Sequence, residues 1–244
     1  MSAIATLAVR TPGQKAEQFA AHLEKKLGRI LCQLEREEVY QVMAHPETDR
    51  RLVIAVLKHY LLEVFSFVPH VTEATFTAIG RLPKNRPDLM KPMILHDLEE
   101  VDHGEMALRD YVRLGGNEKW ARSRRMTPAS FAVAATCRML AVHESPFAYL
   151  GYMYFFEALT PLLAERVLKF MAAKDFPKDA QGFIDFHAKE DIGHARRLHN
   201  LIVRVIRDFP EAAAAIEYGL DCFSGVYPVP IWKAAFRHAQ EELC

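Results

Sequence analysis

The chain has 244 residues, half of them apolar and a quarter charged, and its 31 basic and 31 acidic side chains leave no net charge at pH 7. This composition supports a sizeable core with a soluble surface, and it argues against nucleic acid or an anionic membrane as the main partner. The four cysteines form no C-x-x-C pair, which argues against a disulfide framework, a thiolate zinc site and an iron–sulfur cluster. No abrupt change in composition marks a boundary, so we expect one domain over residues 1–244.

Two apolar stretches bear on cellular location. Residues 1–13 are few and weakly apolar, and their only cation, Arg10, follows the apolar residues instead of preceding them, unlike a signal sequence. Residues 149–163 are interrupted by Glu157 and Pro161, which does not fit a membrane span. We therefore expect a cytoplasmic protein with no membrane partner.

Helical periodicity dominates the sequence. Apolar residues recur at helical spacing in nearly every long segment and show no strand-like alternation, so we expect an all-α fold. Pro69 should bend the second helix, Gly115 and Gly116 should end the third, and Thr127 followed by Pro128 should begin the fourth. The expected helices cover residues 14–44, 48–82, 88–114, 128–141, 145–173 and 178–208, with further helical residues that break at 227–230 and continue to the C-terminus.

Two of these helices carry an acid three residues before a histidine. The pairs are Glu100 with His103 and Asp191 with His194. Three residues make nearly one helical turn, so each pair lies on one face and can bind one cation. The sequence has no phosphate-binding glycine loop and no G-x-S-x-G elbow, so the chemistry must come from side chains on helices. Either pair alone would equally suit an exposed ion pair.

Two further acids, Glu63 and Glu157, each stand alone among aromatic and aliphatic neighbours. Burial of an unpaired carboxylate costs several kcal/mol, so each needs a compensating cation or must stay protonated. A bound metal would supply that cation. The alternatives are a salt bridge to a core arginine or a position at the edge of the helix.

Together, these four contributions from four long helices match a recurring pattern. A carboxylate from each of two helices, with a carboxylate-x-x-His pair from each of two others, holds a dinuclear iron or manganese site in helical bundles. Ligands with oxygen and imidazole donors, and without thiolate, suit either metal. The sequence therefore predicts a dinuclear metal site.

Additional histidines extend the pattern. His187 precedes Asp191 by four residues and completes a set of two histidines and one carboxylate, which can hold a ferrous ion with positions open for dioxygen. His96 has the same offset from Glu100 and is either a ligand or a hydrogen-bond donor to one. Glu99 is the alternative to Glu100 if that helix is rotated.

This spacing, with the segment LEEVDHGE at residues 98–105, resembles the haem-oxygenase-like diiron oxidases and oxygenases. Their superfamily also includes PQQ-synthase-like and thiaminase-II-like proteins. The resemblance covers residues 53–204, and it implies a bundle of about seven helices around a central site for two ferrous ions. Glu63 matches an extra carboxylate found in terminal-alkene-forming fatty acid decarboxylases. The other implied ligands are Glu100, His103, Glu157, His187, Asp191 and His194.

The resemblance also implies an activity. Dioxygen would be the cosubstrate, and the substrate would be an amino acid or fatty acid that undergoes C–C cleavage, desaturation or N-oxygenation. An external electron donor and a homodimer fit the same interpretation. A cofactorless TenA- or PqqC-like enzyme and a non-enzymatic metal-binding protein are the alternatives. Near Glu63 and Glu157, the candidate pocket walls are Tyr60, Phe67, Met153, Tyr154, Phe156 and Thr160.

Overall fold

The computed structural model describes residues 11–244, so the first ten residues, on which the expected absence of a signal sequence mainly depends, lie outside it. Within this range the chain forms eleven α-helices, one 3-10 helix and no strand, which confirms the all-α prediction. The helices are α1 (Pro12–Leu34), α2 (Glu38–Ala44), α3 (Arg50–Gly80), α4 (Pro87–Glu100), α5 (His103–Arg113), α6 (Glu118–Ser123), α7 (Pro128–His143), α8 (Pro146–Ala173), η1 (Lys178–Ala180), α9 (Gly182–Asp208), α10 (Ala212–Ser224) and α11 (Val229–Leu243).

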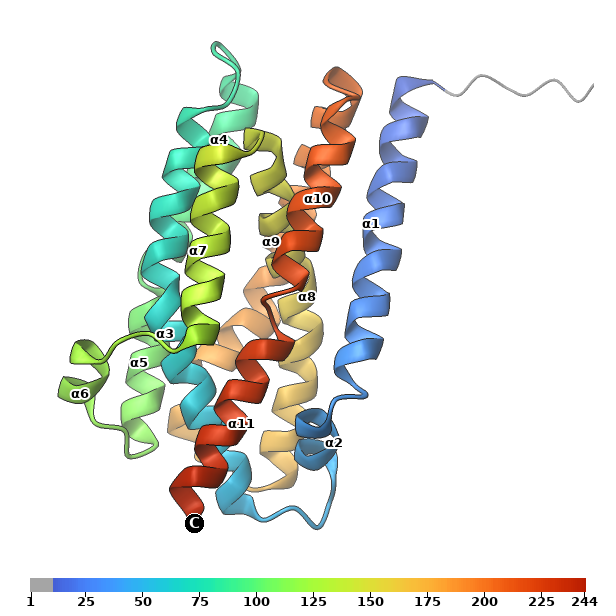
Figure 1. Cartoon of the computed structure of the whole chain (residues 1–244). Coiled ribbons are helices and arrows are strands. Elements are labelled where there is room, and N and C mark those ends of the chain that lie inside the picture. The colour runs from blue at the N-terminus through green and yellow to red at the C-terminus, as the bar shows by residue number, and fades with distance from the viewer. Residues whose placement is uncertain (1–10) are drawn as a thin grey trace, which may run out of the picture.

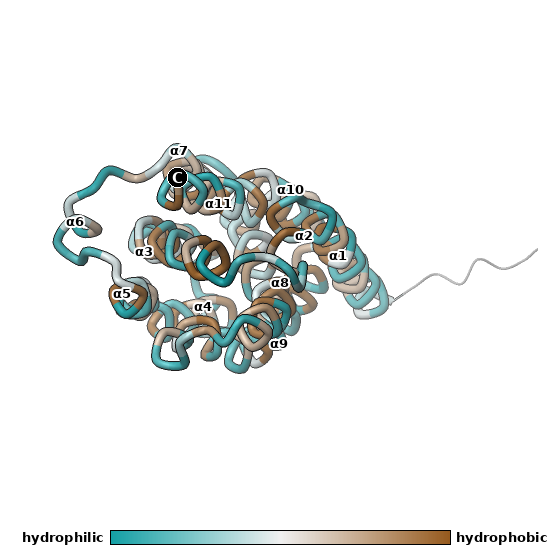
Figure 2. The backbone as a smooth tube through the Cα atoms, turned by 90° about the horizontal axis from the view of Figure 1, so that it is seen from below, coloured by the Kyte–Doolittle hydropathy of each residue, from teal (hydrophilic) through white to brown (hydrophobic). Residues whose placement is uncertain are grey.

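The long helices run side by side as a bundle (Figure 1). Viewed along the helix axes, α3 and α8 lie towards the middle (Figure 2). The packing agrees, because α3 contacts α5, α7 and α11 while α8 contacts α9 and α10. Apolar residues on the facing sides of these helices form one continuous core. A side chain that points inward from α4, α5, α8 or α9 therefore enters the same buried region.

Local signals set several helix ends as expected. The Thr127 side chain accepts a hydrogen bond from the Ser130 amide and caps α7, and Pro128 occupies its first turn. Gly115, with φ of 85°, takes the left-handed conformation just after α5. These ends need no long-range contact, which is why the sequence predicted them.

Two expected helices are each divided in two, so the bundle has more than about seven helices. The first breaks after Leu34, where Glu37 is extended with ψ of 144°. The third breaks after Glu100, where Asp102, a residue of low helix propensity, has φ of −106° and ψ of 6°. Glu100 and His103 therefore lie on consecutive helices and not on one helical face, which corrects the expectation from their spacing.

Among the described helices, only α3 is long and apolar enough to span a membrane by length and composition. More than half of its apolar window, 56%, is buried inside the bundle. Core helices of soluble proteins pass the same test, so this feature alone does not indicate a membrane protein.

Candidate metal centre

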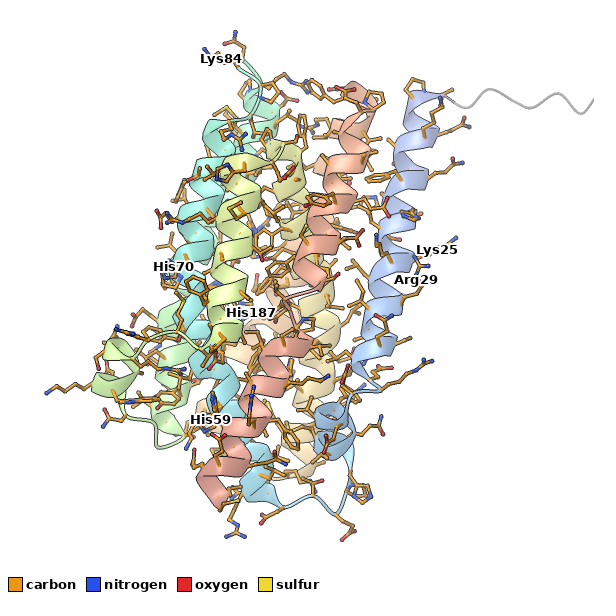
Figure 3. The ribbon with its side chains drawn as sticks, in the orientation of Figure 1. Lys25, Arg29, His59, His70, Lys84 and His187 are labelled. Carbon is orange, nitrogen blue, oxygen red and sulfur yellow. The ribbon has the colours of Figure 1, made fainter. Side chains whose placement is uncertain are left out.

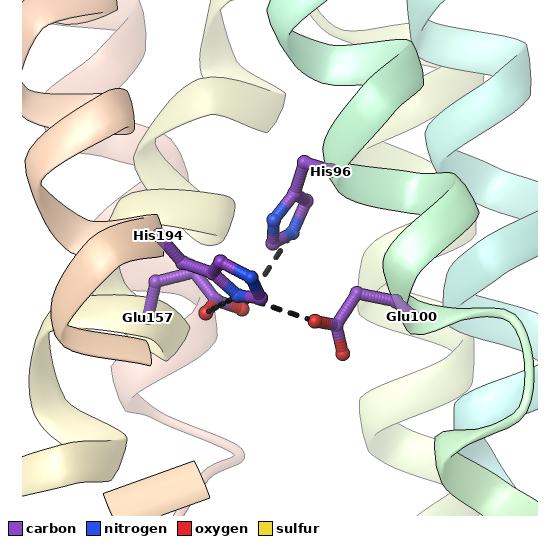
Figure 4. A group of neighbouring side chains, drawn as sticks. All are labelled: His96, Glu100, Glu157 and His194. Carbon is purple, nitrogen blue, oxygen red and sulfur yellow. Dashed lines mark hydrogen bonds and ion pairs between the residues drawn. The ribbon is translucent and has the colours of Figure 1, made fainter. Parts of the chain in front are cut away.

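Side chains from α4, α5, α8 and α9 converge in two groups that suit metal binding. In each group, one donor atom per residue lies within 4.8 Å of the others. Two donors on opposite sides of one ion are about 4.2 Å apart when each bond is roughly 2.1 Å, so small side-chain movements would close either group around a cation. The first group is His96, Glu100, Glu157 and His194 (Figure 4), and the second is Glu100, His103 and His187.

The imidazole of His194 lies at the centre of the first group. Its Nδ1 is 3.0 Å from Glu157 Oε2 and 3.3 Å from Glu100 Oε1. Asp191, one turn earlier on α9, places Oδ1 3.5 Å from the same nitrogen. His96 Nε2 approaches from α4 and lies 3.6 Å from Glu157 Oε1 (Figure 4). Carboxylates from three helices thus surround one imidazole nitrogen.

The second group is built around His187. This side chain lies inside the bundle, unlike the labelled surface residues Lys25 and Arg29 of α1, which extend into solvent (Figure 3). His187 Nδ1 lies 2.6 Å from the carbonyl oxygen of Phe183. A carbonyl can only accept, so Nδ1 donates there and Nε2 keeps a lone pair that a metal can use. This Nε2 is 3.1 Å from His103 Nδ1.

Glu100 connects the two groups. Its Oε1 faces Nδ1 of His194, and its Oε2 contacts Nδ1 of His103. Close contacts with these histidines outweigh the effect of burial and hold the pKa of Glu100 below its usual range. One carboxylate with an oxygen directed at each group has the arrangement of a bridge between two cations.

Protonation in the metal-free site follows from this crowding. Burial, with the charges of Glu157 and Glu100, raises the pKa of Asp191 to about 10. Burial alone would lower the pKa of His194, but its close contacts with Glu100 and Glu157 raise it to about 10. Burial lowers the pKa of His187 to about 4, which keeps its ring neutral at pH 7. Protons on Asp191 and His194 therefore hold the place that a cation would take.

Buried polar atoms without hydrogen bonds gather at the same place. In the part of the chain that the structure describes, six buried side-chain atoms lack a hydrogen-bond partner, and all but one belong to this cluster. They are both oxygens of Asp191 and single atoms of Glu100, His96 and Asp97, while the sixth is Nε1 of Trp232. Such atoms are costly unless something compensates them. Because the donors are carboxylate and imidazole, the residues present fit a pair of iron or manganese ions.

A small enclosed cavity of about 30 Å³ adjoins the first group. A cavity needs about 10 to 15 Å³ to hold one water molecule, so this cavity has room for two or three non-hydrogen atoms. An organic acid could enter only if the surrounding side chains moved. His96, Asp97, Glu100 and Glu157 form its polar side. The expected wall residues that do line it are Phe67, Met153 and Phe156.

The other expected wall residues lie elsewhere. Tyr154 points to a separate surface depression between α1, α8 and α9, because it occupies the side of α8 that packs towards α1. The hydroxyl of Tyr60 is 3.0 Å from that of Tyr227. Thr160 donates to the carbonyl of Phe156. Tyr60 and Thr160 thus make their polar contacts outside the cavity and do not line it.

Glu63 is not brought to either group. Its buried carboxylate accepts hydrogen bonds from the hydroxyls of Thr127 and Ser130 and lies 3.3 Å from a guanidinium nitrogen of Arg124. These partners come from the segment after α6 and from the first turn of α7. The arrangement is the core-arginine alternative, and the ligand role of Glu63 stays a prediction.

One member of the cavity, Asp97, was not singled out from the sequence. It is 2% exposed, and burial raises its pKa to about 7. It precedes Glu100 by three residues, the same offset that relates Glu100 to His103. Applying the spacing rule towards the N-terminus of α4 would have found it.

Glu99 and Glu100 occupy different positions at the cluster. Glu99 is half exposed and binds Arg197, although one oxygen lies 3.0 Å from Nε2 of His194. Glu100 is largely buried and belongs to both groups. Glu99 therefore lies at the outer edge of the cluster.

Comparison with solved structures shows what the fold is similar to. A domain of unknown function with a heme oxygenase-like fold from Shewanella denitrificans has a TM-score of 0.74 at 19% identity, covering 90% of this chain and 93% of that one. A TenA homologue from Pseudomonas syringae has a TM-score of 0.67 at 14% identity, covering 90% and 93%. A CADD-like protein of unknown function from Nostoc punctiforme has a TM-score of 0.66 at 19% identity, covering 92% and 98%.

At such identities the likeness shows the fold alone, which is the haem-oxygenase-like one expected from the motifs. No curated protein matches the sequence. The sequence profile of a family described as iron-containing redox enzymes matches residues 58–224, more than half of the chain. On this match, and with the carboxylate–histidine cluster on four of its helices, the chain belongs to the family of iron-containing redox enzymes.

Proposed function

We propose that this protein is a non-haem diiron oxidase or oxygenase of the cytoplasm that uses dioxygen to oxidise a small organic acid. One observation carries the proposal: Glu100 is shared by two histidine-containing groups, beside an Asp191 whose two buried oxygens lack hydrogen bonds. Iron bound there would supply the electrons and the open coordination positions that dioxygen reduction requires.

The proposed ligands divide between two ions. His96, Glu157, Asp191 and His194 would hold one ion, and His103 and His187 the other, with Glu100 between them. The Phe183 carbonyl fixes the ring orientation of His187, which reduces the ordering needed when metal arrives. Apolar side chains around the cavity exclude water from the place where dioxygen would lie.

The substrate class is a small acid, either an amino acid or a fatty acid, that undergoes C–C cleavage, desaturation or N-oxygenation. Arg197, at the outer edge of the cluster beside Glu99, is the cation we assign to the substrate carboxylate. The cavity must enlarge to admit such a molecule, because its volume is about 30 Å³.

The test is oxygen uptake by protein loaded with ferrous iron under anaerobic conditions. Separate amino acids and fatty acids, each with the same excess of a chemical reductant, are added before oxygen. We expect one class to raise oxygen consumption well above the amount that oxidises the bound iron, with formation of an oxidised product. The matched control is Glu105→Gln, which changes an acid paired with Arg122 on the surface. Uptake no greater with any acid than with the reductant alone, and no oxidised product, would contradict the enzymatic proposal and indicate a metal-binding protein.

A second candidate is a cofactorless TenA-like enzyme. TenA homologues share the fold, and Glu157 and Asp97 are buried acids beside the small cavity, as acid–base catalysis would require. Such a protein would bind no stoichiometric iron. Ferrous titration therefore separates the two candidates.

A further inference from the structure

Three oxidisable aromatic side chains lie in contact beside the metal-binding cluster. The ring of Tyr60 stacks on the indole of Trp232, with 4.5 Å between ring centroids and 16° between planes. Its hydroxyl lies 3.0 Å from the hydroxyl of Tyr227. All three side chains are at least 96% buried, since none is more than 4% exposed. The three rings therefore form a continuous path that is shielded from solvent.

One end of this path packs against the walls of the cavity beside the cluster. The ring of Tyr227 lies 5.1 Å from that of Phe156 and 6.1 Å from that of Phe67, two walls of the cavity. Phe156 directly precedes Glu157. Tyr227 therefore packs against the wall of the cavity that adjoins the proposed ligands.

The other end leads towards the surface. Trp232 shares a small apolar cavity with Tyr40 of α2, and Tyr40 is only partly buried. Within residues 11–244, Nε1 of Trp232 is one of the few buried polar atoms without a hydrogen-bond partner. Buried tryptophans usually pair this N–H, so the indole is held mainly by ring contacts. A donor at the α2 surface would meet Tyr40 and then Trp232.

We propose that Trp232, Tyr60 and Tyr227 conduct electrons from the α2 surface to the metal-binding cluster. This rests on the proposed function, in which dioxygen is the oxidant, and it assigns the reductant to an external one-electron donor. No part of the proposed oxidase function requires these three side chains as ligands or cavity walls. They would instead supply electrons that the substrate does not.

The steps balance in electrons and protons. Reduction of dioxygen at the cluster would remove one electron and one proton from Tyr227 and leave its phenoxyl radical. This radical takes one electron and one proton from Tyr60 along the hydrogen bond between the two hydroxyls, so the O–H bond of Tyr60 breaks and that of Tyr227 forms. The external donor then returns one electron to the Tyr60 phenoxyl radical through the stacked indole of Trp232, which keeps its N–H bond, and the donor also gives the proton that restores the O–H bond of Tyr60.

The test uses metal-free protein, so that it does not depend on iron. The chain has two tryptophans, and Trp120→Phe leaves Trp232 as the only indole. Photo-oxidation of Trp232 by an ultraviolet laser flash runs the path in reverse, because the oxidised indole takes an electron from the Tyr60 ring that stacks on it and leaves a tyrosyl radical. We expect indolyl absorbance to be replaced by tyrosyl absorbance in a first-order step that is independent of protein concentration.

Adding Tyr60→Phe should slow this step at least tenfold. The control is Tyr154→Phe, the same change at a buried tyrosine outside the path, which should leave the rate unchanged. Equal rates with and without Tyr60 would overturn the proposal. A second variant, Tyr227→Phe, should keep the fast step but change the electron paramagnetic resonance spectrum of the tyrosyl radical, and an unchanged spectrum would exclude Tyr227 from the path. Iron titration of the same proteins separates failure of the path from failure of the diiron proposal.

Discussion

Glu63 and Asp191 are both fully buried acids, but only the carboxylate of Glu63 has hydrogen-bond partners. Arg124 and two hydroxyl groups satisfy the Glu63 carboxylate. Neither oxygen of Asp191 has a hydrogen bond, and its nearest ionisable partner in the cluster is His194, at 3.5 Å. Burial of a lone acid therefore does not by itself identify a metal ligand. The useful criterion is whether the protein already neutralises the charge.

The difference separates a structural contact from a binding site. Arg124 already balances the charge of Glu63 without any ligand, and this ion pair joins α3 to the segment that precedes α7. Around Asp191 the metal-free protein depends on bound protons, which cost free energy to retain as the pH rises. A cation would release these protons and stabilise the folded state.

The largest effect is expected at the residue common to both groups. Glu100→Ala should reduce bound iron from about two ions per chain to less than one, because each proposed site loses an oxygen ligand. Anaerobic ferrous titration followed by metal analysis measures this. Glu105→Gln, at an exposed acid, is the control and should keep both ions. Retention of two ions by Glu100→Ala would show that Glu100 is not shared.

The next largest effect is expected on the free energy of unfolding and not on metal binding. Glu63→Gln leaves the buried guanidinium of Arg124 without its counter-charge, so we expect the free energy of unfolding to fall by about 3 to 5 kcal/mol. Urea denaturation of the metal-free protein measures this loss, and iron binding should be unchanged. If the variant instead lost iron with little loss of stability, Glu63 would leave Arg124 to bind metal, as its motif predicts.

At Asp191, replacement of the acid by its amide should stabilise the metal-free protein. Its folded pKa of about 10 exceeds the usual 3.8, so folding takes up a proton, and the resulting stability is complete below pH 3.8 and lost as pH rises towards 10. Asp191→Asn removes this dependence and should raise the free energy of unfolding by about 1 to 4 kcal/mol near pH 8. Unfolding curves from pH 5 to about 9 test it, and a steeper loss of stability in the variant would contradict the assignment.

The smallest effect is expected at the edge of the cluster. Glu99→Gln removes a half-exposed carboxylate that is already paired with Arg197, so iron affinity should change by only a few-fold. Competition with a ferrous chelator measures the affinity. A loss as large as that of Glu100→Ala would reverse the choice between these neighbouring acids.

Much of the fold and of the site could be predicted, because the necessary signals are local. Helical periodicity gave the all-α class, and spacing along α9 gave Asp191 and His194, which lie 3.5 Å apart, and His187, which the structure places with His103 in the second group and not with His194. The break after Glu100 was missed because it depends on a single residue, Asp102, within an otherwise helical pattern. That break changes the geometry of the pair without separating it, since Glu100 still contacts His103.

The surroundings of Glu63 could not be predicted for a different reason. Its partner Arg124 is 61 residues away and lies between the expected helices 88–114 and 128–141. Pairings of this kind depend on tertiary packing, which helical spacing does not report. The path from Trp232 to Tyr227 is equally non-local, since Tyr60 and Tyr227 are 167 residues apart.

The central claim is that the cluster around Glu100 holds two iron ions in one shared site. Mössbauer spectroscopy of protein loaded anaerobically with enriched ferrous iron, and then exposed to oxygen, tests it most directly. The predicted result is two high-spin ferric ions per chain whose spins are coupled through a bridging ligand. A single uncoupled ferric ion per chain, or no bound iron, would contradict the claim.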